Sequence, residues 1–353
     1  MNFSPDIPNI TTIGGLAKMT LLLRDRYNLS SDRISDMSLI DFQRHLAVRK
    51  PETFLYPLIV NSPESAEAID EAFQLYTSAC WHESGFPAFD LSHSMAAAMA
   101  LTDPSDVLGE DFKIPFQAFA IRLPSNFLFI SGRDGKRQEA AYGLIHQMPV
   151  YQKGEGGTPE EHRILFRIIG RSSQIEGLTS LWEINILPDP NKPLREWISS
   201  EVPTQKNLSE AFTQKAVNDR PSMNAFRRIA INVCLYIAAL GKGEKIERPK
   251  PKKSKRKIKE VAAPSPNVWI LGKEVHLDSH TINAARSWCS AQTDAVEMER
   301  WKLQSQFTVR GHWRNQLHGP KNSLVKRIWI KPFTKGEGPT KIAHIYTMEE
   351  KHD

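Results

Sequence analysis

Side chains that can bind phosphate or move a proton recur at every second position near the C-terminus. In Val309-Arg310-Gly311-His312-Trp313-Arg314, the alternation of a strand would place Arg310, His312 and Arg314 on one face. Two guanidinium groups beside an imidazole can hold a phosphate, and a histidine there can also move a proton on an RNA 2′-hydroxyl. The segment therefore predicts phosphate binding or, alternatively, RNA cleavage with His312 as the catalytic residue.

A second basic and aromatic segment, Lys326-Arg327-Ile328-Trp329-Ile330-Lys331, follows across a turn. Alternation would place Arg327, Trp329 and Lys331 together, and such a face can stack bases or bind an acidic, aromatic-rich peptide. The alternative is that the tryptophans fill a small core while the charges face water.

A lysine-rich stretch precedes these segments, because residues 241–260 hold ten lysines and arginines and three glutamates. A flexible polycation releases counterions from any polyanion that it neutralises, without sequence specificity. The candidate phosphate contacts are Lys252, Lys253, Lys255, Arg256 and Lys257. The alternatives are a linker whose charge only maintains solubility and a nuclear-import signal.

Signatures of familiar enzymes and of metal or cofactor sites are missing from the sequence. There is no phosphate-binding Gly-x-x-x-x-Gly-Lys, no dinucleotide fingerprint, no His-Glu-x-x-His and no Cys-x-x-Cys. Cys80, His82 and His93 could bind zinc, but their spacing matches no compact zinc module. His276 and His280 flank Asp278, which we expect to cap a helix instead. We therefore expect no metal and no cofactor, and an enzymatic role is less favoured than binding.

Composition indicates a folded chain with an uneven charge distribution. The 353 residues are 40% hydrophobic and 24% charged, close to globular averages. Residues 242–353 hold 23 lysines and arginines against 12 acidic residues, net +11, which leaves net −5 for residues 1–241. Such asymmetry favours a polyanionic partner for the basic part.

The sequence also predicts the compartment. Three widely spaced cysteines fit a reducing environment. The longest uncharged apolar stretch, near residues 229–240, falls short of the roughly 18 residues of a membrane span, and the N-terminus lacks the pattern of a secretory signal. We therefore expect a cytoplasmic protein.

Hydrophobic periodicity predicts an α+β fold with three successive parts. Residues 1–241 form an α+β recognition domain, in which a helical N-terminal segment precedes a central antiparallel sheet and a long core helix. Residues 242–265 form a basic flexible linker. Residues 266–353 form a small aromatic and basic α+β domain. The expected helices are Thr12–Tyr27, Leu39–Val48, Pro63–Thr77, Leu91–Leu101, Pro193–Ser199, Leu208–Val217, Pro221–Leu240 and Ser279–Cys289, and the expected strands are Ile114–Ile121, Asn126–Ser131, Tyr142–Val150, Ile164–Ile169, Leu181–Leu187, Val268–Leu277, Phe307–Asn315, Leu324–Pro332 and Ile342–Tyr346.

The C-terminal segments carry a resemblance to a known family. The Arg310-Gly311-His312-Trp313 run, the Gly319-Pro320 turn and the Trp-x-x-Pro of residues 329–332 resemble the phage and plasmid family of the type V-A anti-CRISPR that blocks biogenesis of the effector nuclease. Weaker similarities are Thr53–Pro57, Leu123–Phe129 and the order of long helix, basic linker and Trp269-Ile270-Leu271-Gly272.

The resemblance implies a mobile-element-encoded protein that acts in the cytoplasm of a bacterial host cell, where it recognises a nascent polypeptide at the ribosome and lowers expression of its target through loss of the mRNA. On this hypothesis the N-terminal domain binds a protein or nascent peptide, and the basic C-terminal third contacts RNA or the ribosome, with no membrane partner. The alternatives are an RNA-cleaving enzyme using His312 with Arg310 and Arg314, with His318, His344 or Glu297 as a possible second acid–base group, and a phage structural or nucleic-acid-binding protein.

Overall fold

The computed structural model describes twelve segments of the chain: residues 13–29, 33–37, 39–49, 63–104, 106–131, 136–150, 161–170, 180–186, 188–199, 210–240, 266–290 and 307–335. Within them, helices and strands combine into the α+β fold that the periodicity predicts. The predicted linker and the predicted strand Ile342–Tyr346 lie outside the described residues.

A mixed sheet forms the centre of the molecule. Its strands lie in the order β7 (Ser180–Ile186), β6 (Glu161–Gly170), β5 (Arg137–Val150), β3 (Ala118–Arg122), β1 (Pro87–Leu91) and β8 (Asn267–Leu271), with β4 (Phe129–Ser131) paired to β5. The half from β3 to β7 is antiparallel, as expected. The other half is parallel, because β1 pairs in parallel with both β3 and β8. Strand β1 was not predicted from the sequence, because its residues continue almost directly into helix α5.

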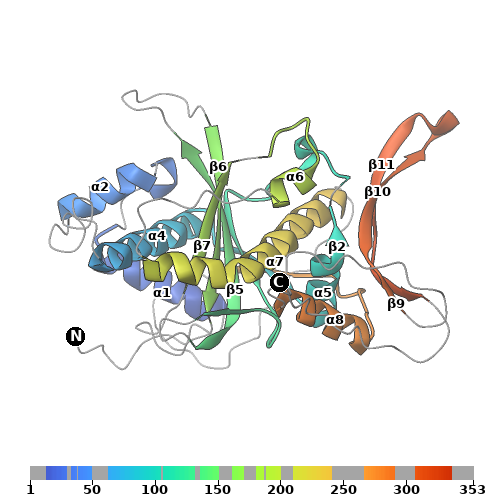
Figure 1. Ribbon diagram of the computed structural model, residues 1–353. Helices are drawn as coiled ribbons and strands as arrows, with labels where there is room; N and C mark the ends of the chain where they lie inside the picture. The colour runs from blue at the N-terminus through green and yellow to red at the C-terminus, as the bar shows by residue number, and fades with distance from the viewer. Residues whose placement is uncertain are drawn as a thin grey trace, which may run out of the picture.

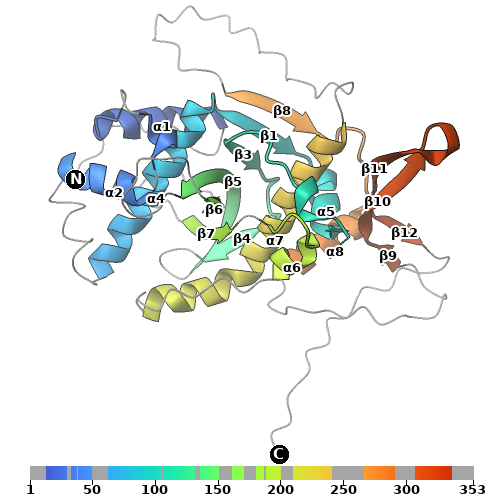
Figure 2. The ribbon, with the colours of Figure 1, turned by 90° about the horizontal axis from the view of Figure 1, so that it is seen from above.

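Helices cover both faces of this sheet, as Figure 2 shows. One face carries α1 (Ile13–Arg26), α2 (Leu39–Arg49) and α4 (Pro63–Glu83), and the other carries α5 (His93–Leu101), α6 (Leu194–Ser199), α7 (Glu210–Leu240) and α8 (Ser279–Ser290). Strand alternation sorts the side chains between the two faces. Ala88 and Ala120 belong to the core under α4, while Phe89 and Phe119 belong to the core under α7. Both faces are therefore apolar.

Helix α7 corrects one prediction. The expected helices Leu208–Val217 and Pro221–Leu240 are one continuous helix with Pro221 inside it rather than in its first turn. A proline in a helix interior removes one backbone hydrogen bond, a cost that tertiary contacts can offset. Asp219 is one such contact, because its carboxylate accepts hydrogen bonds from the Ser131 backbone N–H and hydroxyl, both at 2.8 Å.

The buried part of α7 is long and apolar. Within the described residues, the helical segment Asp219–Leu240 has the length and composition of a membrane span. No membrane span was expected from the sequence. Of the most apolar window of this segment, 67% is buried inside the protein. Phe226 shows how closely it packs, because a Cβ on Gly143 of β5 would stand 1.8 Å from its ring. The burial identifies this segment as a core helix.

The remaining helix predictions hold to within a turn or two. Helix α4 extends six residues past the predicted end at Thr77. Helix α5 begins after Ser92, whose side chain accepts a hydrogen bond from the Met95 N–H at 3.1 Å and so caps it. Asp278 caps α8 as expected, since its Oδ1 accepts from the Thr281 N–H at 2.8 Å.

The described part of residues 266–353 shares its core with the rest of the chain. Strand β8 is hydrogen-bonded along its length to β1 in the main sheet. Leu271, Ala285, Cys289 and Trp313 belong to the same buried cluster as the side chains of α5 and α7. The predicted boundary at residues 242–265 therefore does not divide the hydrophobic core into two.

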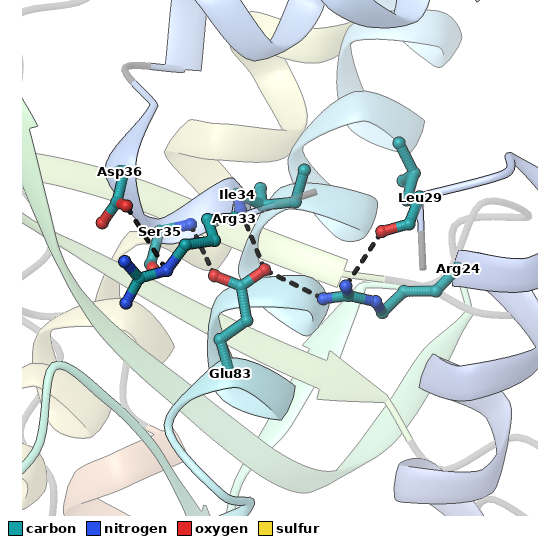
Figure 3. Close-up of polar contacts among 7 residues, drawn as sticks. All are labelled: Arg24, Leu29, Arg33, Ile34, Ser35, Asp36 and Glu83. Carbon is teal, nitrogen blue, oxygen red and sulfur yellow. Dashed lines mark hydrogen bonds and ion pairs between the residues drawn. The ribbon is translucent and has the colours of Figure 1, made fainter. Parts of the chain in front are cut away.

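A carboxylate joins the N-terminal helices to one another (Figure 3). Glu83, at the end of α4, accepts hydrogen bonds from the backbone N–H groups of Ile34 and Ser35, both at 2.8 Å, and from Arg24 Nη1 at 3.0 Å. Arg24 also donates to the Leu29 carbonyl at 2.9 Å. These hydrogen bonds lower the Glu83 pKa although burial opposes them. The contact fixes α1, α4 and the short helix η1 (Ile34–Asp36) together.

Candidate functional site: an anchored hairpin

The two segments with candidate chemistry form one hairpin that stands off the body of the protein (Figure 1). Strands β10 (Gly311–His318) and β11 (Leu324–Ile330) pair antiparallel, and β10 also pairs in parallel with the short β2 (Thr102–Asp103). A second small ribbon, β9 (Phe307–Val309) with β12 (Phe333–Lys335), flanks its base.

A buried hydrogen-bond network anchors the hairpin through Trp313. The Trp313 indole N–H donates to Asn232 Oδ1 of α7 at 2.8 Å. The Asn232 amide nitrogen donates in turn to the carbonyls of Met99 at 2.9 Å and Thr102 at 3.0 Å. Asn232 and Trp313 are 0% and 4% exposed. Because each of these buried polar groups has a partner, the base of the hairpin is fixed against α5, β2 and α7.

Trp329 and Gly311 complete the anchor. The Trp329 indole N–H donates to Thr102 Oγ1 at 3.0 Å, and its ring packs edge-on against Tyr236 of α7 with centroids 5.4 Å apart. A Cβ on Gly311 would stand 2.5 Å from Thr102 Oγ1 and 2.8 Å from Pro332 Cδ. Gly311, Trp313, Trp329 and Pro332, which carry part of the family resemblance, therefore lie in the anchor, whereas the Gly319-Pro320 turn lies between the two strands at the far end of the hairpin.

The pairing register sorts the predicted binding residues onto two different faces. Trp313 lies opposite Trp329 and Asn315 opposite Arg327, so these four side chains share the face that turns toward the body. Arg327 forms an ion pair with Asp111 there. Arg327 and Trp329 therefore lie on the face of the hairpin opposite to that of His312.

The opposite face of the hairpin, termed the outer face, carries exposed basic and imidazole side chains. His312, Arg314 and His318 alternate along β10 with Gln316, and Lys326 lies opposite Gln316 on β11. All are exposed, and Arg314 donates to Gln316 Oε1 at 3.2 Å. Lys326 was not among the predicted site residues, because alternation along β11 alone does not show which of its side chains share a face with His312.

The other predicted site residues lie elsewhere. Arg310 is half-buried between β9 and β10. Burial lowers the pKa of Arg228 of α7, and the nearby charge of Arg310 acts in the same direction while Asp103 opposes it. Lys331 is exposed just after β11. The five candidates of the lysine-rich stretch, Lys252, Lys253, Lys255, Arg256 and Lys257, lie outside the described residues.

A shallow recess of about 370 Å³ lies between the hairpin and residues 106–111. Its lining combines acidic, apolar and amide side chains with one arginine: Asp106, Leu108, Glu110, Asp111, Asn315, Val325 and Arg327. The backbone on its acidic side is fixed, because the N–H groups of Gly109 and Glu110 donate to the carbonyls of Lys192 and Pro190 at 2.9 and 3.0 Å. No motif indicated this recess, because its two walls are some 200 positions apart in the chain.

The cysteine and histidines weighed as zinc ligands do not converge. Within the described residues no group of three or more histidine, cysteine or acidic side chains could hold a metal ion. Burial raises the pKa of the Cys80 thiol and lowers that of His82, whose ring packs edge-on against Phe86. Glu83 is occupied by the contacts of Figure 3.

Comparison with known proteins places the chain in a family. The model of the anti-CRISPR type V subtype A2 family, AcrVA2-like, matches residues 89–334. A solved structure, the crystal structure of AcrVA2, is 12% identical and aligns with a TM-score of 0.46 over 91% of this chain and 93% of that one. No curated protein matches the chain. Because the family model spans well over half of the sequence, this protein belongs to the anti-CRISPR type V subtype A2 family.

Proposed function

We propose that this anti-CRISPR-like protein recognises a nascent polypeptide and lowers expression of its target through loss of the mRNA, in the cytoplasm of a bacterial host. On this proposal the outer face of the hairpin contacts RNA or the ribosome, together with the lysine-rich stretch. Family membership supports the anti-CRISPR role. The observation that carries the RNA contact is that His312, Arg314, His318 and Lys326 are exposed on one face of an anchored hairpin.

The anchor matters energetically, because a pre-ordered cationic surface loses less conformational entropy when it binds than a mobile one. Phosphate contacts from such a surface make RNA affinity fall as salt rises. In a plot of the logarithm of the affinity against the logarithm of the salt concentration, each contact contributes roughly one unit to the slope.

A reporter experiment tests whether the nascent peptide or the mRNA is recognised. The N-terminal coding segment of a type V effector nuclease is fused to a fluorescent reporter in bacteria that express this protein. Two controls separate the signals: synonymous recoding changes the RNA but not the peptide, and a compensated frameshift changes the peptide with almost the same RNA. We expect reporter mRNA to fall for the original and recoded segments and to persist for the frameshifted one. Loss that follows the RNA sequence, or no loss, contradicts the proposal.

The RNA contact is tested by the salt dependence of RNA affinity. Arg314→Gln with Lys326→Gln should reduce the log–log slope by about two. Lys18→Gln, which removes one charge at an exposed position of α1, is the control and should leave the slope unchanged. An unchanged slope in the double variant excludes the outer face as a phosphate contact.

The alternative, RNA cleavage by His312, gains no support from the geometry. His318 lies six positions along the same strand, about 20 Å away at the rise of a strand, and so cannot act on the same proton. His344 and Glu297 lie outside the described residues.

A further inference from the structure

We propose that the recess between the hairpin and residues 106–111 is a docking groove for an extended peptide in which a lysine or arginine alternates with aliphatic residues. The inference rests on the proposed function, because it locates the peptide that the protein would recognise. It also differs from the expectation that peptide recognition belongs to residues 1–241 and RNA contact to the basic C-terminal third, because one wall of the groove is formed by the hairpin.

Near the turn of the hairpin, apolar side chains are exposed on the face that lines the recess. Leu317 of β10 and Val325 of β11 lie directly opposite each other and are 57% and 61% exposed. They share the face of Asn315 and Arg327, which line the recess, and Leu108 on the facing wall is 37% exposed. Exposed aliphatic residues grouped this way are typical of interaction surfaces.

The charge of the recess selects the occupant. Three carboxylates, from Asp106, Glu110 and Asp111, face one guanidinium, that of Arg327, which is paired with Asp111. Within the described parts of the chain, Asp106 and Glu110 make no ion pair. A protein of net charge +6 thus carries a locally acidic wall, which attracts a basic side chain and repels nucleic acid phosphates.

An open strand edge supplies backbone partners. Strand β11 is at the edge of its three-stranded sheet, and no other described strand pairs with its outer side. An extended peptide can add to such an edge through main-chain hydrogen bonds. Its side chains two positions apart would then face the same side, about 7 Å apart. One of these peptide side chains reaches the acidic wall beside Arg327, and the side chain two positions further along reaches Leu317 and Val325. The expected peptide pattern is therefore basic–x–aliphatic.

Fluorescence anisotropy with the full-length protein and labelled synthetic peptides tests the groove. The probe consists of three Lys-Thr-Leu-Thr repeats, and the two comparison peptides carry Glu for Lys or Ser for Leu. We expect the probe to bind and each comparison peptide to bind at least about tenfold more weakly. The double substitution Asp106→Asn with Glu110→Gln should lower the affinity for the probe by about tenfold, and Val325→Thr should lower it several-fold. Asp25→Asn with Asp41→Asn, the same change of charge on exposed parts of α1 and α2, should have no effect.

Several outcomes would overturn the groove: no binding of the probe, equal binding of the Glu peptide, or unchanged affinity in the Asp106/Glu110 double variant. A concentration-dependent dimer that Val325→Thr abolishes would assign the surface to a second copy of the chain, and also overturns the proposal.

The reporter experiment distinguishes failure of the groove from failure of the proposed function. If the groove is wrong and the proposed function is right, the Asp106→Asn/Glu110→Gln variant lowers reporter mRNA as strongly as the unmodified protein. If the function is wrong and the groove is right, the unmodified protein leaves reporter mRNA unchanged while the anisotropy results hold.

Discussion

His146 shows how burial can turn a single residue into a source of pH dependence. It lies on β5 under α4, is 1% exposed and packs edge-on against Tyr76 with ring centroids 5.1 Å apart. Among the described residues neither of its ring nitrogens has a hydrogen-bond partner. Burial lowers its pKa to about 3, far below the 6.5 of an exposed histidine. The folded protein therefore holds this imidazole neutral.

Acid should destabilise the protein through His146. Between about pH 6.5 and 3 the unfolded chain binds a proton that the folded chain does not, so stability is complete above pH 6.5 and falls as the pH decreases, by up to about 1.4 kcal/mol per unit. Urea unfolding of the wild type and of His146→Phe between pH 6.5 and 5 measures the effect, because the Glu83 carboxylate titrates below this range. We expect the free energy of unfolding of His146→Phe to change less with pH than that of the wild type. Equal pH dependence in the two proteins would contradict the role of His146.

At the scale of the element, the hairpin is predictable as two strands but not as a two-sided surface. The alternation in Val309–Arg314 correctly separates His312 and Arg314 from Trp313. Alternation within β11 likewise groups Arg327 with Trp329, but which β10 face they join depends on the register, and a shift of one residue exchanges the faces. The register pairs Trp313 with Trp329, so Arg327 turns toward Asp111.

Gly311→Ala should loosen this element. The added Cβ would meet Thr102 Oγ1, Pro332 Cδ and, at 3.0 Å, the Ile330 carbonyl oxygen, so we expect a loss of about 1–3 kcal/mol from the overpacked anchor. Gly14→Ala in α1 is the matched control, since no atom lies within 4 Å of its added Cβ and stability should stay equal or rise by less than about 1 kcal/mol. Thermal unfolding compares the two, and hydrogen exchange should show faster exchange in residues 311–330 for Gly311→Ala. Equal melting temperatures would disprove the role of Gly311.

At the scale of the whole molecule, strand β8 determines how the parts of the chain depend on one another. It crosses from the C-terminal third to the edge of the main sheet beside β1. Trp269 on β8 then packs between the body's aromatic side chains, with its ring centroid 5.2 Å from Phe116 and 5.5 Å from Phe89. The basic third is therefore connected to the N-terminal part by core contacts as well as by the chain.

A fragment of residues 1–241 should consequently be unstable. Without β8 and α8, the backbone edge of β1 and the apolar faces of Phe89 and Met95 would be exposed to water, which favours aggregation. Expression of this fragment alone, and together with residues 266–353, measures the dependence by solubility and circular dichroism. We expect insoluble or poorly folded protein alone and recovery on co-expression. A soluble, cooperatively folding fragment would contradict this prediction and support the two-domain division expected from the sequence.

Features that depend on neighbouring residues, and the family, could be predicted before the fold was known. Helix and strand periods predicted most elements, the caps at Ser92 and Asp278 follow local hydrogen-bonding rules, and the C-terminal motif identified the anti-CRISPR family that the family model confirms. Features that depend on partners far apart in the chain became visible only in the folded protein. These are the addition of β8 to β1, the burial of Trp313 against Asn232, and the recess between residues 106–111 and the hairpin. The physical reason is that a period fixes which side chains share a face, whereas packing and register decide what that face meets.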